Sequence, residues 1–254
     1  MPEDEGSAFA LADLGDWRIG RFAALGEFPG LAHAVTTRHG LDVEVARSDR
    51  AAAASLVAER LGLDAVAYAN QVHGADVLAV GAGGPAGDAD GLVTDVPGLG
   101  VMAFSADCPL LLVADSAGPA VGVAQSSWRG TLKGMPSRLI EAMTERFGAS
   151  PAVLVACIGP SAGPCCYEVG GEVLAAAVDA LGLGAERFFR ARPNGKYLFD
   201  LWAACRDQLL RAGLRRRNVH TAALCTLCRN DLFPSYRVEG PLAGRFVAAL
   251  ARPR

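Results

Sequence analysis

The stretch GVMAFSADCPLLLVADSAGPAVGVAQ (residues 100–125) contains three short apolar runs that are separated by Asp, Ser, Gly and Pro. Runs of this length, rich in Val, Leu and Ala and bounded by turn-forming residues, are typical of β-strands. They cover residues 100–107, 109–115 and 119–125. The segments between them are too short to hold a helix. The stretch therefore predicts several adjacent strands in the middle of the chain.

Helices and further strands are expected on both sides of this stretch. Ser48 or Asp49 can cap a helix that ends at Gly62, and a second helix at about 130–147 carries one apolar stripe. Other helices are expected at about 171–182 and 199–212, and other strands at 65–72, 76–80, 152–158, 219–224 and 244–251. This mixture predicts an α+β protein with mixed sheets. No linker divides the 254 residues, so a single domain over 1–254 is expected.

The composition excludes several classes of partner. The formal net charge is −3, and charges of both signs are mixed along the chain, which favours neither nucleic acid nor an anionic membrane. The uncharged window 148–167 is interrupted by three prolines, so it is interpreted as a buried strand and a loop, with no membrane span. The acidic N-terminus does not resemble a signal peptide, and seven cysteines, an odd number, suggest a reducing cytoplasm.

Polar side chains stand at three places where an apolar run ends: NQVHG (70–74), SADCP (105–109) and AQSSWRG (124–130). Adjacent strands could bring these ends together. A Cys and a His in one cleft, here Cys108 and His73, permit two chemistries: a thiolate nucleophile with an imidazole base, or two ligands of a zinc site. Arg129 opens the following helix, whose N–H groups favour an anion such as phosphate.

The motif CTLC (225–228) is a bare C-x-x-C. A structural zinc site needs a second ligand pair, and the adjacent cysteines Cys165 and Cys166 do not have the usual spacing. A thioredoxin-type centre would place the motif at the start of a helix, which RNDLFPSYR does not suggest. The sequence therefore favours no metal or redox role for CTLC.

Several of these segments, in this order, resemble the laccase-domain (YfiH-like) family, also described as purine nucleoside phosphorylases and linked to peptidoglycan editing. The segments are NQVHGADV, DGLVTD, ADCPLLLVAD, WRGTLKG, IGPSAGPCCYEVG, FDLWAACRDQLLRAG and FPSYR…GR. The resemblance covers roughly residues 30–250. It implies a four-layer α/β/β/α fold with mixed sheets, preceded by a variable N-terminal segment of about residues 1–29.

The resemblance also implies a zinc site made by the His of QVHG, the Cys of ADC and a second His that begins an HAGWRG motif. The first two ligands fall on His73 and Cys108, but the third falls on Gln125. A Gln amide oxygen binds zinc poorly compared with an imidazole nitrogen. We therefore expect weak or absent zinc, unless His39 or Asp107 reaches the site. The laccase name itself is discounted, because four scattered histidines cannot build a multicopper centre.

The activity implied by the resemblance is phosphorolysis of adenosine, inosine and 5′-methylthioadenosine, together with deamination of adenosine. The expected partners are a nucleoside and phosphate, and the expected state is a monomer or homodimer. His73, Cys108 and Gln125 are the expected catalytic residues, with Arg38 and Arg129 for anion binding. Tyr167, Tyr236 and Arg237 are expected to shape the pocket. Two alternatives stay open: a hydrolase that uses Cys108 and His73 on peptidoglycan precursors, and a catalytically degenerate relative.

Overall fold

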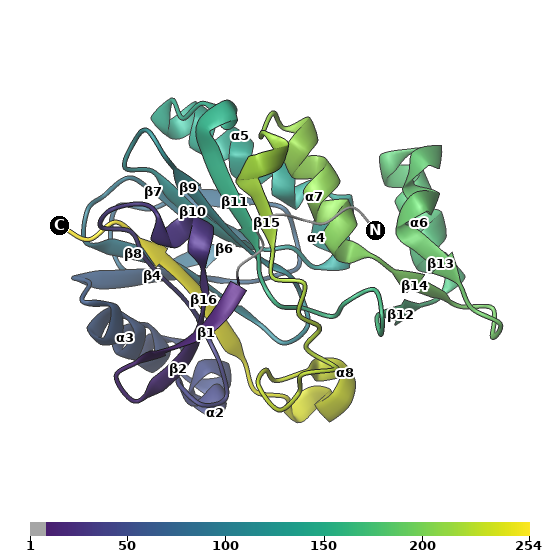
Figure 1. Ribbon diagram of the computed structural model, residues 1–254, viewed down its shortest axis with the longest axis horizontal. Helices are drawn as coiled ribbons and strands as arrows, with labels where there is room; N and C mark the ends of the chain where they lie inside the picture. The colour runs from purple at the N-terminus through teal and green to yellow at the C-terminus, as the bar shows by residue number, and fades with distance from the viewer. Residues whose placement is uncertain (1–8) are drawn as a thin grey trace.

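Two mixed β-sheets lie face to face at the centre of the molecule (Figure 1). The computed structural model describes residues 9–254. The first sheet has seven strands, in the order β1 (Phe9–Leu14), β2 (Trp17–Phe22), β3 (Ala32–Thr36), β16 (Phe246–Ala251), β8 (Leu99–Ser105), β4 (Ala65–Asn70) and β6 (Gly84–Asp88). The second has six, in the order β15 (Val219–Thr221), β11 (Leu154–Ile158), β9 (Leu110–Asp115), β10 (Val121–Gln125), β7 (Gly91–Thr94) and β5 (Val77–Ala79).

The three apolar runs of the central stretch form strands, but they do not all enter one sheet. β8 belongs to the first sheet, where it pairs with β16 and β4, whereas β9 and β10 pair with each other in the second sheet. The chain crosses from one sheet to the other over residues 106–109. The segment that contains Cys108 is therefore the crossing point between the two sheets.

Every residue of β8, β9 and β10 is buried, because each of these strands packs on both faces. Alternate residues, such as Ala103 of β8 and Leu112 of β9, enter the core between the two sheets. Their neighbours, such as Met102 and Leu111, face the helices outside. The continuous apolar runs in the sequence follow from this double burial.

Helices cover the outer face of each sheet and complete four layers. α2 (Val43–Ser48) and α3 (Arg50–Leu61) pack on the first sheet, and α4 (Trp128–Leu132), α5 (Met135–Phe147) and α7 (Leu201–Arg211) pack on the second (Figure 1). This α/β/β/α arrangement confirms the expected fold. α3 is terminated by Gly62, as predicted. The backbone of Gly62 has a left-handed conformation. The helix expected over 130–147 is two helices, because Gly134 between them is also left-handed.

Short elements complete the structure outside these layers. A small sheet of β12 (Glu168–Val169), β14 (Tyr197–Phe199) and β13 (Phe189–Ala191) lies beside α6 (Gly171–Leu181) at one side of the molecule (Figure 1). Two further short helices are α1 (Ala23–Gly26) and α8 (Tyr236–Glu239). Residues 9–26 of the expected variable N-terminal segment form β1, β2 and α1, while residues 1–8 lie outside the described residues. Among residues 9–254, no helix has both the length and the hydropathy to span a bilayer.

Candidate functional site

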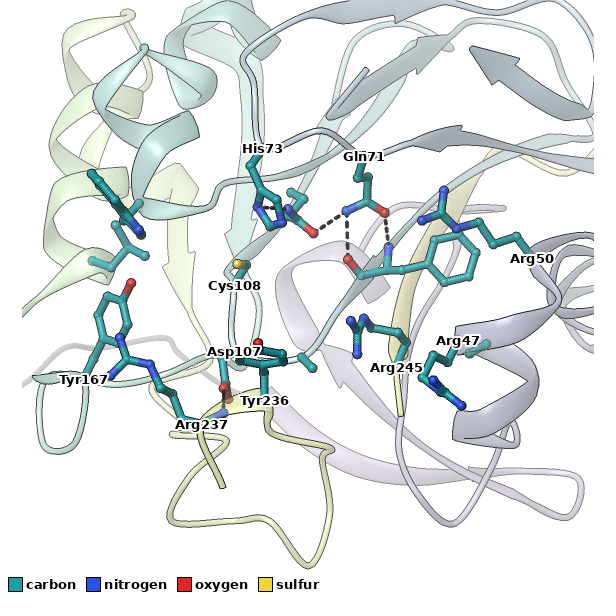
Figure 2. Close-up of a pocket in the computed structure, with 16 residues that line it drawn as sticks. Arg47, Arg50, Gln71, His73, Asp107, Cys108, Tyr167, Tyr236, Arg237 and Arg245 are labelled. Atoms are coloured by element: carbon teal, nitrogen blue, oxygen red, sulfur yellow. Dashed lines mark hydrogen bonds between the residues drawn. The ribbon is translucent and has the colours of Figure 1, made fainter. Parts of the chain in front are cut away.

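A cavity of about 520 Å³ opens where the two sheets, α2 and the C-terminal segments meet. Its walls include His73, Cys108 and Gln125, one from each of the three strand-end motifs. The structure thus brings together side chains that are separated by up to 52 positions in the sequence. Figure 2 shows His73 and Cys108 at the middle of the cavity, with Arg50 and Arg245 on one side and Tyr167 with Arg237 on the other.

The loop that carries His73 is held by a buried carboxylate. Asp90 accepts hydrogen bonds from the backbone N–H groups of Val72, His73 and Gly74, at 3.1, 3.1 and 2.6 Å. His73 itself has a φ of 58°, which is uncommon for a residue with a side chain. Such strain is found at functional sites, where the surroundings hold it in place. The loop geometry therefore fixes the direction of the imidazole.

A chain of amides determines how Gln125 faces His73. Gln71 donates from Nε2 to the carbonyl of Phe104 at 2.8 Å and accepts from the Phe104 N–H at Oε1, at 2.9 Å. This pair of backbone contacts fixes which end of the Gln71 amide is Nε2, and Nε2 also donates to Gln125 Oε1. The Nε2 atom of Gln125 consequently points at His73 Nδ1, 2.9 Å away.

This contact decides the tautomer of His73. An amide N–H only donates, so Nδ1 must accept, and the neutral ring carries its proton on Nε2. In this arrangement neither ring nitrogen presents a lone pair to a metal ion. At the position where the resemblance implies a third ligand, Gln125 therefore makes a hydrogen bond, and this bond occupies Nδ1 of His73.

The surroundings of Cys108 favour its neutral thiol over the thiolate. Burial, followed by the nearby carboxylates of Asp107 and Asp90, raises the pKa of the Cys108 thiol to about 12. Within residues 9–254, no hydrogen bond joins its Sγ atom to His73. A nucleophilic cysteine needs a lowered pKa or an adjacent base, so this environment argues against the hydrolase alternative.

The cavity residues do not fit a zinc ion in the arrangement observed. Asp107, one of the two alternative donors, accepts the Thr226 hydroxyl at Oδ1 and the Arg237 N–H at Oδ2, at 2.6 and 2.7 Å. His39, the other, is not among the residues that line the cavity. A multicopper centre does not fit either, since the described residues hold no metal-binding group that contains a histidine.

Three arginines line the side of the cavity next to α2 and α3. Arg47 is paired with Glu44, whereas Arg50 and Arg245 pair with no carboxylate within residues 9–254. Burial, together with the cations of Arg47 and Arg50, lowers the pKa of Arg245. The guanidinium of Arg50 lies 5.3 Å from the centre of the Phe104 ring. Two of the three cations on this side of the cavity thus form no ion pair among the described residues, an arrangement that favours an anion.

Aromatic side chains line the opposite side. Tyr167 is buried, which raises the pKa of its hydroxyl to about 12, and the Arg237 guanidinium stacks on its ring at 4.9 Å. Trp128 and Tyr236 also line the cavity. Tyr167, Tyr236 and Arg237 are therefore in the cavity, as the sequence suggested.

Arg38 and Arg129 are not among the lining residues. Arg38 pairs with Glu239, and Arg129 is exposed and lies over the Trp128 ring at 4.3 Å. Sequence reasoning overlooked Gln71, Arg50 and Arg245. Gln71 and Arg245 belong to the motifs NQVHG and GR. The sequence therefore marked both residues as parts of motifs but did not indicate what they do.

A second cluster lies outside the cavity. The Sγ atoms of Cys165, Cys166, Cys225 and Cys228 all lie within 4.8 Å of one another, and this group can hold a metal ion. The expectation that Cys165 and Cys166 cannot provide a second ligand pair for CTLC is therefore wrong. The tight turn after Gly163, whose carbonyl accepts from the N–H groups of Cys166 and Tyr167, brings the adjacent cysteines to CTLC.

Comparisons with known proteins agree with this fold. The purine nucleoside phosphorylase YlmD of Geobacillus stearothermophilus is 33% identical over 89% of this chain and 91% of its own length. A purine nucleoside phosphorylase of Xylella fastidiosa is 35% identical over 86% of this chain and 91% of its own. The crystal structure of YlmD from Geobacillus stearothermophilus superposes with a TM-score of 0.85 and 27% identity, over 98% of this chain and 100% of that one.

The family model described as multi-copper polyphenol oxidoreductase laccase matches residues 34–253. That range includes both sheets except β1, β2 and part of β3, and every residue named above as lining the cavity. The chain therefore belongs to this laccase-like family, to which the motifs of the sequence pointed.

Proposed function

We propose that the protein is a purine nucleoside phosphorylase that acts on adenosine, inosine or 5′-methylthioadenosine. In this reaction the bond between the ribose C1′ and the purine N9 breaks. A bond forms between C1′ and a phosphate oxygen, and the departing base takes a proton. The proposal is supported by the names of the similar proteins, which cover most of this chain.

The observation that carries the proposal is that two arginines in the cavity form no ion pair with a carboxylate among the described residues. Arg50 and Arg245 have no carboxylate partner among the described residues, and they face the same space as Tyr167 and His73. Two guanidinium groups bind the oxygens of a phosphate dianion with charge-assisted hydrogen bonds. Arg50 and Arg245 therefore take the role that Arg38 and Arg129 were expected to play.

The rest of the cavity suits the nucleoside. Tyr167, Trp128 and Tyr236 offer aromatic faces against which a purine and ribose can pack. His73 carries a proton on Nε2 in the tautomer that Gln125 imposes, and this proton is the one proposed to meet the departing base. Cys108, a thiol at neutral pH, contributes an apolar wall in this scheme.

Phosphorolysis is proposed as the main activity, with deamination much weaker. Deamination needs an activated water, which a bound zinc supplies by lowering the pKa of that water to about 7. The tautomer of His73 and the amide of Gln125 disfavour zinc in the cavity. The unpaired cysteines favour the cytoplasm as the compartment.

The test is an assay of purified protein with each nucleoside in the presence and absence of inorganic phosphate, with the free base and the ribose 1-phosphate measured by chromatography. We expect release of base that depends on phosphate. Arg245→Gln should raise the KM for phosphate at least 10-fold, as expected for a lost charged contact of about 1.4 kcal/mol or more.

Arg129→Gln is the matched control, because Arg129 is an exposed arginine outside the cavity. Its KM for phosphate should equal that of the unmodified protein. Base release that is independent of phosphate, or an effect of Arg129→Gln larger than that of Arg245→Gln, would contradict the proposal.

A further inference from the structure

Four cysteines meet at a point where two loops touch outside the cavity. Cys165 and Cys166 belong to the loop after β11, and Cys225 and Cys228 to the loop after β15. Two of the sulfur–sulfur distances are 3.7 Å, from Cys165 to Cys228, and 3.4 Å, from Cys166 to Cys228. None of the four side chains lines the cavity.

These distances match one small metal ion. With Zn–S bonds of about 2.3 Å, the sulfur atoms of a tetrahedral site lie about 3.8 Å apart. The observed separations, none above 4.8 Å, need little adjustment to reach that value. A set of four sulfur ligands at this spacing is typical of a structural zinc site.

The backbone around Cys225 is arranged to stabilise a thiolate. The N–H of Gly163 donates to Cys225 Sγ at 3.3 Å. A side chain at Gly163 would place its Cβ 2.7 Å from Trp202 and 3.0 Å from Cys225, so this approach requires glycine. N–H donors of this kind support metal-bound thiolates.

A metal ion held by the four sulfurs displaces the thiol protons, because the thiolate is the form of cysteine that binds metals.

We propose that Cys165, Cys166, Cys225 and Cys228 bind one structural zinc ion, which clamps the loop after β11 to the loop after β15. The clamp is separate from the cavity and from the zinc ligands that the family resemblance implies.

The contacts on either side of the cluster indicate what the clamp positions. Tyr167, in the cavity wall, follows Cys166 directly. Thr226, inside CTLC, donates to Asp107, and the other oxygen of Asp107 holds the N–H of Arg237. The Arg237 guanidinium in turn stacks on Tyr167. The four cysteines thus act as positioning residues for one wall of the cavity.

The first experiment measures metal content by mass spectrometry of the elements, in protein purified under reducing conditions, reloaded with Zn²⁺ and dialysed. We expect one zinc per chain, which Cys228→Ser and Cys225→Ser lose. Cys228 is exposed, so Cys228→Ser tests the site even if Cys225→Ser fails to fold. The controls His73→Ala and Cys108→Ser, both in the cavity, should keep their zinc.

Reloading with Co²⁺ gives a second measurement that does not depend on activity. Four thiolates produce intense thiolate-to-cobalt absorption and the visible bands of a tetrahedral ion, and Cys228→Ser should lose both. A chelator should lower the Tm of the zinc-loaded protein and leave that of Cys228→Ser unchanged. Protein without zinc after reloading, or zinc that is lost from His73→Ala and kept by Cys228→Ser, would overturn the proposal. Neither outcome depends on whether the protein cleaves nucleosides.

Discussion

Gln125 determines the tautomer of His73 through one nitrogen atom. Its orientation is dictated from a distance: the backbone of Phe104 fixes Gln71, Gln71 fixes the oxygen end of Gln125, and the nitrogen end then faces His73. A His at the same position could present a lone pair to a metal ion. The Gln can only donate a proton to Nδ1. With Gln in place of His at position 125, a potential set of metal ligands becomes a hydrogen-bonded network.

Gln125→His should create a zinc site in the cavity. It removes the donor that occupies His73 Nδ1 and adds an imidazole near Cys108. Because loss of an outer-shell partner alone costs about 10–100-fold in affinity, the gain of a direct ligand should exceed that range. The measurement is a zinc titration against a competing chelator, carried out in the Cys228→Ser background so that only the cavity is observed.

The control for this titration is Gln125→His combined with His73→Ala, which should bind zinc no better than the parent. If Gln125→His leaves the zinc affinity unchanged, the residue at position 125 is not what limits zinc binding in the cavity.

At the scale of elements, the junction of β2 and β3 contains an unusual pairing. The ladder between these strands joins Ile19 to Thr36 and Gly20 to Val35. Beyond it, His33 Nε2 accepts the backbone N–H of Phe22 at 3.0 Å. His33 is fully buried, and this burial, with the charge of Arg21, lowers its pKa to about 4. The His33 ring thus accepts an N–H that a backbone carbonyl accepts in a regular ladder. It can accept this hydrogen bond only while the ring is neutral.

Acid should therefore weaken this junction. The unfolded chain binds a proton at His33 below pH 6.5, whereas the folded chain does so only near pH 4. Stability is fully present above pH 6.5 and is lost as the pH falls towards 4, by up to about 3 kcal/mol. Urea unfolding at several pH values measures this slope. His33→Gln, which keeps an acceptor and does not titrate, should flatten it, and an equally steep slope in that variant would contradict the assignment.

The sequence predicted the elements that depend on local signals and missed those that depend on long-range pairing. α3 was predictable because Asp49 and Gly62 cap its two ends. The division of β8 and β9 between two sheets was not, because both runs are equally apolar. The cysteine cluster was missed for a related reason: the parallel pairing of β11 with β15 brings the two following loops together, and spacing within either loop does not reveal it.

The candidate site was predictable in part for the same physical reason. His73, Cys108 and Gln125 end strands, so their convergence followed from strand packing. Arg50 lies in the first turn of a helix, where an arginine is ordinarily a surface residue. Its place in the cavity depends on how α3 sits against the first sheet, which periodicity alone does not specify.

At the scale of the whole molecule, the cavity couples distant parts of the chain. Its walls come from α2, α3, α4, α7 and α8, from the ends of β4, β8 and β10, and from the residues directly before β12 and β16. A ligand that fills this cavity would therefore contact both sheets and the C-terminal segment at once. Since these parts must separate when the chain unfolds, binding is linked to global stability.

Inorganic phosphate should accordingly raise the Tm through Arg50 and Arg245. A ligand at 100 times its Kd adds about 2.7 kcal/mol, which for a chain of this size corresponds to roughly 5–10 °C. Phosphate also stabilises proteins without binding, by exclusion from their surface. The informative quantity is therefore the difference between variants at equal ionic strength in thermal melts. The Tm rise in Arg245→Gln should fall to the non-specific level, while Arg129→Gln keeps the full shift. Equal shifts in both variants would remove the arginine pair as the phosphate site, since a ligand stabilises only through groups that it contacts in the folded state.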